Sequence, residues 1–92
     1  MNTETNKPLD TIRDGSLKAT IWKNPGKADK PPFYSVNLTR SYKDDQGKWH
    51  DSDSFSGTEL LQLARLANLA YTKITVYRAH DRAEKELAGT AA

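Results

Sequence analysis

The chain has 92 residues, of which 36% are apolar, so it is long enough for one small domain and excludes a second. Lys and Arg number 14 and Asp and Glu number 12, which leaves a formal net charge of only +2. The absence of cysteine excludes disulfides, thiolate catalysis and cysteine-ligated zinc. No apolar run is long enough for a signal sequence or a membrane span, and the sequence therefore favours a cytoplasmic protein.

The folded part is expected in the middle of the chain. Large apolar side chains are scarce in residues 1–11 and 79–92, which predicts a flexible N-terminal tail and a frayed or disordered C-terminal tail around a single domain over 12–78. That domain holds 11 basic and 7 acidic residues. This excess of positive charge permits a polyanionic partner without requiring one.

The first predicted strand spans residues 16–24. It follows Asp14-Gly15, a pair that is typical of tight turns because both residues tolerate positive φ. Its residues alternate, so that one face holds Leu17, Ala19 and Ile21, and the other holds Lys18, Thr20 and Trp22. The larger aromatic ring is therefore expected on the polar side of the sheet.

A second strand is predicted over 33–42, after a proline-rich basic loop at 24–32 that cannot form regular structure. Its apolar face holds Tyr34, Val36 and Leu38, and its polar face holds Ser35, Asn37, Thr39 and Ser41. Turn residues at 44–47 and an extended pattern at 48–50 predict a hairpin. From this third strand Lys48 and His50 are expected on the polar face, and Trp49, like Phe55, is expected to point inward. In a continuous strand Asp51 and Asp53 would lie on the same face as Trp49, because side chains alternate between the two faces. These carboxylates cannot be buried unpaired, so the strand should bulge or end near Asp51.

A helix is predicted from Gly57 to about Arg78, because Ser56 and Glu59 have the spacing of a capping box. The β-branched residues of 72–78 leave a final strand there as an alternative. The expected core stripe of the helix consists of Leu60, Leu63, Ala64, Ala67, Tyr71 and Ile74. A second apolar side, formed by Leu61, Leu66 and Leu69, predicts a homodimer interface. The expected fold is therefore α+β, with an antiparallel sheet of three to four strands followed by one C-terminal helix packed on one face.

No motif for catalysis or cofactor binding is present. The five glycines are isolated, so there is no phosphate-binding loop, and neither a nucleophile elbow nor a zinc-binding helix motif occurs. His50 stands beside Asp51 and Asp53, but adjacent carboxylates in a turn are usually solvated surface groups. The sequence therefore predicts a protein that is not an enzyme, with no cofactor and no metal.

The polar face of the sheet predicts contact with single-stranded DNA or RNA. It combines a flat aromatic ring, hydrogen-bonding side chains and cations, and nucleic-acid bases stack on exposed rings while Lys and Arg neutralise phosphates. The expected binding residues are Lys18, Trp22, Lys23, Asn37, Thr39, Arg40, Lys43 and Lys48. The structural alternative is that Trp22 only covers the sheet edge or packs under the proline-rich loop, and that the lysines only keep the protein soluble.

A second functional hypothesis is a regulatory module that binds another protein through its helix or its proline-rich loop. The segments 12–24, 33–36, 40–44 and 54–61 together resemble a group of small uncharacterised bacterial, plasmid and phage proteins. This resemblance implies a prokaryotic or mobile-element origin. The order of elements is also similar to that of PC4-like single-stranded-DNA-binding domains, which pair through their helices, although fold alone does not fix function.

Overall fold

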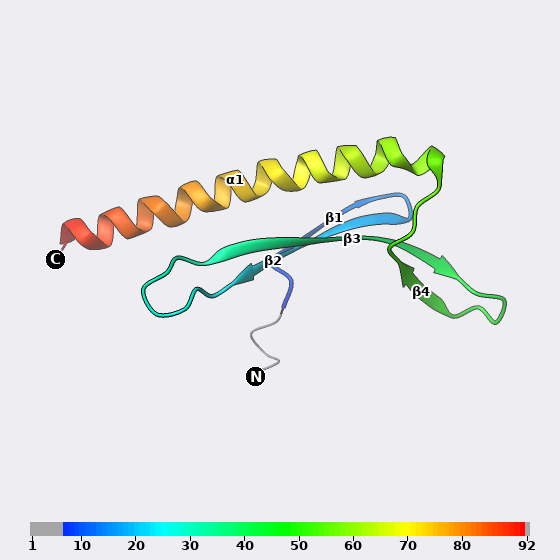
Figure 1. Ribbon diagram of the computed structural model, residues 1–92, viewed down its shortest axis with the longest axis horizontal. Helices are drawn as coiled ribbons and strands as arrows, with labels where there is room; N and C mark the ends of the chain where they lie inside the picture. Colours follow the sequence, from blue (N-terminus) through cyan, green and yellow to red (C-terminus); the bar gives the residue numbers. More distant parts are fainter. Residues whose placement is uncertain (1–6, 92) are drawn as a thin grey trace.

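The computed structural model describes residues 7–91, with side chains described as far as Leu87; residues 1–6 of the expected N-terminal tail and Ala92 lie outside the described part. The molecule has two layers, a four-stranded antiparallel sheet and one long helix that covers one face of it (Figure 1). Its extents are 59 × 31 × 15 Å. The expected α+β arrangement, with the helix on one face, is confirmed.

The sheet consists of β1 (Asp10–Asp14), β2 (Leu17–Asn24), β3 (Phe33–Lys43) and β4 (Trp49–Ser52). Their spatial order follows the chain, and each strand pairs antiparallel with the next. β1 includes residues 10 and 11, which the sequence analysis assigned to the N-terminal tail. This strand is the fourth one, and it was not foreseen because it is short and carries a single large apolar side chain, Ile12.

The two turns that the sequence predicts join the strands as expected. Gly15 has φ +63° and occupies the first position of the two-residue connection between β1 and β2, where glycine is favoured. Gly47 has φ +80° in the connection between β3 and β4. There the Asp44 carboxylate accepts hydrogen bonds from the amides of Gln46 and Lys48. β4 ends at Ser52, close to the predicted limit of that strand.

The core lies between the sheet and the helix. Leu17, Ala19 and Ile21 of β2 are buried there, which confirms the predicted inner face of that strand. The remaining apolar residues of the sheet and of the following loop that pack against this cluster are Ile12, Tyr34, Val36, Leu38 and Phe55. The inner face of β3 is thus also confirmed, and so is the inward position of Phe55.

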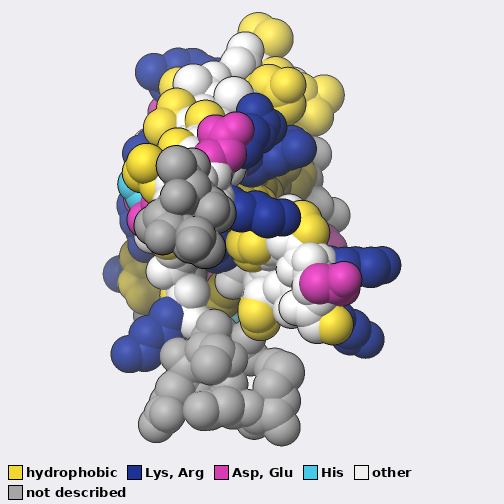
Figure 2. Space-filling model, turned by 90° about the vertical axis from the view of Figure 1, so that its left-hand side faces the viewer, with side chains coloured by type: hydrophobic (Ala, Val, Ile, Leu, Met, Phe, Trp, Pro, Cys, Tyr) yellow, Lys and Arg dark blue, Asp and Glu magenta, His cyan; other side chains and the backbone are white. Residues whose placement is uncertain are grey.

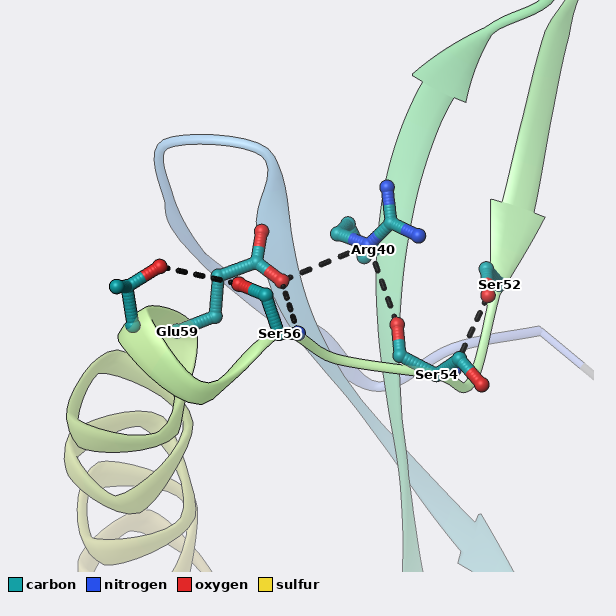
Figure 3. Close-up of polar contacts among 6 residues, drawn as sticks. Arg40, Ser52, Ser54, Ser56 and Glu59 are labelled. Atoms are coloured by element: carbon teal, nitrogen blue, oxygen red, sulfur yellow. Dashed lines mark hydrogen bonds and ion pairs between the residues drawn. The ribbon is translucent and has the colours of Figure 1, made fainter.

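The helix begins where the sequence predicts, with a 3-10 turn, η2 (Gly57–Glu59), that leads into α1 (Leu60–Ala91). The Glu59 carboxylate accepts a hydrogen bond of 2.8 Å from the Ser56 amide (Figure 3). The same oxygen lies 3.6 Å from Nε of Arg40, and this nitrogen donates to the Ser54 carbonyl. The start of the helix is therefore tied to β3 by Arg40.

The helix continues past Arg78 to Ala91, through the segment that was expected to fray, and no strand forms over 72–78. The hydroxyls of Thr72 and Thr75 donate to the carbonyls four residues earlier, so these β-branched residues fit the helix. Further along, Asp81 accepts hydrogen bonds from Tyr34 and Lys23. These contacts fix the helix to the sheet beyond the point where its apolar pattern ends.

The face of α1 that meets the sheet differs from the predicted stripe. The helix buries Leu66 and Ala70 completely or nearly so, and Leu63 and Ile74 pack around them. The other members of the predicted core stripe, Leu60, Ala64, Ala67 and Tyr71, are exposed. Leu66 is 0% exposed and therefore cannot belong to a dimer interface, which corrects its assignment; Leu61 and Leu69 are exposed.

Polar contacts explain this rotation of the helix. Asp14 accepts hydrogen bonds from Gln62 and Arg65, and Asp10 pairs with Lys73 at 2.8 Å. Asp10 also accepts a hydrogen bond of 3.1 Å from the Tyr77 hydroxyl. Both aspartates lie on β1, so one side of α1 is held along that edge strand by four helical residues. β1 was not foreseen from the sequence, and these anchors were therefore missed.

Candidate nucleic-acid interface

Over residues 7–91, which the structure describes, one face of the sheet has no helix on it. The register pairs Lys18 with Thr39, Thr20 with Asn37, and Ser41 with Asp51, and paired residues share a face. We call the face opposite α1 the open face. By this register it comprises Thr11, Arg13, Lys18, Thr20, Trp22, Asn24, Phe33, Ser35, Asn37, Thr39, Ser41, Lys43, Trp49 and Asp51.

Trp22 lies half-buried on the open face, on the side of β2 opposite its buried leucine, alanine and isoleucine. Its indole N–H donates a hydrogen bond of 2.6 Å to Oδ1 of Asn37. This bond links the ring to the neighbouring strand and limits its rotation. Asn37 therefore serves first as a structural partner of Trp22.

Trp49 also lies on the open face, and the expectation that it points inward was wrong. It pairs with Lys43, is 66% exposed, and has the Lys43 ammonium 5.2 Å from its ring centroid. Its parity is that of Asp51, which the sequence already placed outside the core. The polar character of Asp51 was the signal that should have decided the side on which Trp49 lies.

A third aromatic residue, Phe33, stands at the end of β3 nearest Trp22. It is 59% exposed and pairs with Asn24, next to the pair formed by Trp22 and Ser35. The sequence analysis counted it only as the start of a strand. Phe33 and Trp49 thus add two exposed rings to the face on which one was foreseen.

The cations of the open face are Arg13, Lys18 and Lys43, and its one carboxylate is Asp51. Lys18 lies 3.2 Å from Asp51. The pKa of Asp51 is held below its usual value, first by the Ser41 hydrogen bond and then by Lys18, so this carboxylate stays ionised at neutral pH. Arg13 was missing from the predicted set because its strand was not foreseen.

Two shallow grooves run along the open face and meet at Arg13, Lys18 and Asp51. One, of about 360 Å³, reaches Trp22 and passes Asn37 and Thr39. The other, of about 540 Å³, reaches Trp49 and passes Ser41. Because the two share three lining residues, they form one continuous track with a tryptophan toward each end.

Two of the predicted binding residues lie on the opposite face, which corrects their assignment. Lys23 shares the parity of the β2 core residues and pairs with Asp81 at 3.0 Å. Arg40 shares the parity of Val36 and Leu38 and contacts Glu59, as described above. Both were grouped with the open-face residues by charge alone, without regard to strand alternation.

Lys48 and His50 are the other two side chains that were expected on the polar face; Lys48 lies in the connection between β3 and β4, and His50 lies in β4. Lys48 precedes β4, and its amide donates to Asp44. His50 pairs with Tyr42 on the helix side of the sheet, where the two rings are stacked at 5.3 Å. Its Nε2 lies 2.7 Å from Oδ2 of Asp44. His50 is therefore not part of the open face.

One further group of side chains has the composition of a metal site. His80, Asp81 and Glu84 bring one ligand atom each to within 4.8 Å of one another on α1. Both carboxylate oxygens of Asp81 accept hydrogen bonds, from Lys23 and from Tyr34. Asp81 is thus already engaged by two protein donors, and a metal ion at this group would compete with them.

Comparison with protein-family models, with curated proteins and with solved structures found no match. The resemblances drawn from the sequence therefore stay predictions. Among the described residues, no helix combines the length and apolar character that a membrane crossing requires.

Proposed function

We propose that this protein binds single-stranded nucleic acid through the open face, with low sequence selectivity. The observation that carries the proposal is the continuous groove, which has Trp22 and Trp49 toward its two ends and Arg13 and Lys18 where its halves meet. Bases of every kind stack on aromatic rings, at about 1–3 kcal/mol per base, and cations neutralise phosphates without reading sequence. This chemistry fits the side chains of the groove.

A single strand suits the open face better than a duplex. The face is the surface of a sheet, and α1 lies on the other side of that sheet, so among the described residues the open face carries no helix that would enter a major groove (Figure 1). From Ser35 to Lys43 the strand β3 spans about 27 Å at the usual rise of antiparallel strands. That length accommodates a strand of about four nucleotides or more.

The charge of the open face predicts moderate affinity with clear salt dependence. Arg13 and Lys43 have no ion pair among the described residues, while Lys18 is partly neutralised by Asp51. Contacts between three cations and phosphates give a slope of about −2 in a plot of log affinity against log salt concentration.

The test is a titration of a fluorescently labelled oligonucleotide of thymidines, followed by anisotropy at low salt. The Trp22→Ala and Trp49→Ala variants are each expected to weaken binding about tenfold, since each removes one stacking platform. Tryptophan emission provides a second readout, because stacking quenches the ring that remains in each variant.

The matched control is Tyr42→Ala, which removes an aromatic ring from the same sheet but from the helix side. It should bind as the unaltered protein does. The proposal fails if the folded protein shows no binding at low salt, or if Tyr42→Ala weakens binding as much as the tryptophan variants do.

The second candidate function is a regulatory protein that binds another protein through α1 or the proline-rich loop. Exposed apolar side chains on the first half of the helix favour it, since Leu61 is 84% and Tyr71 72% exposed. A folded protein that binds no oligonucleotide, together with partner capture that depends on Leu61, would favour this function over the first.

A further inference from the structure

A third groove lies away from the open face, on the helix side of the sheet. It occupies about 510 Å³ between the proline-rich loop (residues 25–32) and the C-terminal half of α1. This volume is within the range of small-ligand sites, about 300–1,000 Å³. Its apolar lining comes from Ala28, Pro31, Pro32 and Tyr34, and its charged lining from Asp29, Lys30, Arg78, Asp81, Arg82 and Lys85.

Positive charge dominates this loop–helix groove. Lys30, Arg78, Arg82 and Lys85 have no ion pair among the described residues. Asp81, by contrast, is already bonded to Lys23 and Tyr34, so its charge is balanced within the protein. Figure 2, which looks onto the end of the molecule where α1 terminates, shows Lys and Arg side chains gathered there.

The spacing of the helical cations indicates a ligand with more than one negative charge. Arg78, Arg82 and Lys85 follow one another at four and three residues, so they lie along one side of α1 within about 10 Å. Like charges at this spacing destabilise a helix unless an anion is bound between them. The three cations therefore form a row rather than a single point of charge.

The loop that forms the other wall is closely packed. A Cβ on Gly26 would collide with the backbone oxygens of Lys30 and Pro31, and the Lys30 amide donates to the Lys27 carbonyl at 2.9 Å. The loop thus holds Lys30 and the two prolines in place opposite the arginines. Such preorganisation lowers the entropy cost of binding.

We propose that the loop–helix groove binds a phosphorylated ligand that carries at least two phosphate groups. Guanidinium groups bind phosphate oxygens in pairs, and each phosphate ester carries up to two negative charges, which suits a row of three cations. The prolines and the edge of Tyr34 offer an apolar surface for the rest of the ligand. The same chemistry is supplied by a free phosphorylated molecule or by the backbone of a nucleic-acid strand.

The proposal is independent of the open face, because Tyr34 and α1 lie on the other side of the sheet. Calorimetric titrations with pyrophosphate, with adenosine diphosphate and with a five-residue oligonucleotide distinguish the two sources. Binding of the diphosphates identifies a free phosphorylated molecule as a ligand. Because the open face is expected to bind the oligonucleotide as well, this titration uses Trp22→Ala combined with Trp49→Ala as the background. Binding of the oligonucleotide alone in that background, with dependence on Arg78 and Arg82, identifies the strand.

The variant that tests the site is Arg78→Gln combined with Arg82→Gln. Its control is Arg65→Gln, which removes one arginine, paired with Asp14, from the first half of the same helix. The double variant should lose at least tenfold in affinity for whichever probe binds, while Arg65→Gln keeps it. Trp22→Ala should keep the affinity for the two diphosphates, because Trp22 lies outside this groove. Circular dichroism should show that the double variant is folded, since both side chains are exposed.

Three results would overturn the proposal. The first is the absence of binding for all three probes at low salt. The second is an equal loss in Arg65→Gln, which would indicate general charge attraction. The third is an oligoglutamate peptide that binds as tightly as pyrophosphate, which would indicate an acidic peptide as the ligand in place of a phosphorylated one.

Discussion

At the scale of single residues, Asp81 connects three parts of the molecule. It lies on α1 and accepts hydrogen bonds from Tyr34 of β3 and Lys23 of β2. The Tyr34 ring in turn stacks on Tyr77, one turn earlier in the helix, at 6.0 Å. These contacts hold the helix over the end of the sheet, where the buried aliphatic cluster no longer reaches.

The pKa of Asp81 is lowered, first by the Tyr34 hydrogen bond and then by Lys23. A carboxylate whose pKa is lower in the folded than in the unfolded state stabilises the fold above its unfolded pKa, about 3.9. This stabilisation is lost as the pH falls from that value through the folded pKa. At neutral pH, Asp81→Asn should therefore lower the free energy of unfolding by about 1 kcal/mol, discounted for partial exposure.

Thermal melts followed by circular dichroism measure this effect between pH 2 and pH 7. The difference between the unaltered protein and Asp81→Asn should be largest at neutral pH and shrink below about pH 4. Glu84→Gln, an exposed carboxylate on the same helix, serves as the control. A constant difference at all pH values would show that the charge of Asp81 plays no part.

At the scale of elements, the proline-rich loop depends on Gly26. Its φ is ordinary, and the constraint is steric, because an added Cβ would meet backbone atoms that cannot yield without moving the loop. The loop contributes no residue to the core cluster. A change at Gly26 should therefore alter the loop and leave the stability of the sheet and helix nearly unchanged.

Gly26→Ala is expected to shift the backbone amide resonances of residues 27–30 and to weaken pyrophosphate binding several-fold, because the wall of the loop–helix groove moves. Gly57→Ala is the matched control, since an added Cβ there meets nothing within 4 Å. If the loop resonances of Gly26→Ala coincide with those of the unaltered protein, the steric constraint at Gly26 is contradicted.

At the scale of the whole molecule, the core is small. The described residues hold five fully buried apolar side chains, and a chain of this size buries a modest share of its surface. An exposed apolar patch, formed by Leu60, Leu61, Ala64, Ala67 and Tyr71, follows one side of α1. Association of two copies through this patch would cover apolar surface and stabilise the fold.

We therefore expect a homodimer in solution, with a sedimentation mass near twice 10.3 kDa at micromolar concentration. Leu61→Glu should shift the protein to the monomer, because a charge in the contact is left unpaired. Leu87→Glu changes a leucine that is also exposed, at the other end of the helix, and should leave the mass unchanged. A monomeric mass for the unaltered protein would contradict the expectation.

Much of the fold could be predicted because it follows from short-range patterns. The alternation of Leu17, Ala19 and Ile21 fixes which face of β2 is buried, and the glycines at 15 and 47 mark turns that require positive φ. The start of the helix follows from Ser56 and Glu59. Each of these features involves residues only a few positions apart.

The candidate site was predictable only in part. Trp22, Asn37 and Thr39 lie on the open face as alternation requires, and Lys18 and Lys43 join them. Arg13 required the pairing of β1 with β2, which the sequence does not state, whereas the side of Trp49 could have been decided from Asp51. Arg40 and Lys23 were assigned by charge, although their parity places them beside the helix.

The amino-acid sequence by itself determined the central strands β2 and β3, the turns, the helix start and the tryptophan on the outer face of β2, since local backbone and alternation rules decide these. Only the tertiary structure decided which side of α1 is buried and how far the helix extends. The helix has apolar residues on several sides, so its own pattern leaves the rotation open. The contacts of α1 with Asp10 and Asp14 select one rotation of the helix, and the contacts of Asp81 with the sheet extend its packed length. All of these contacts join residues far apart in the chain.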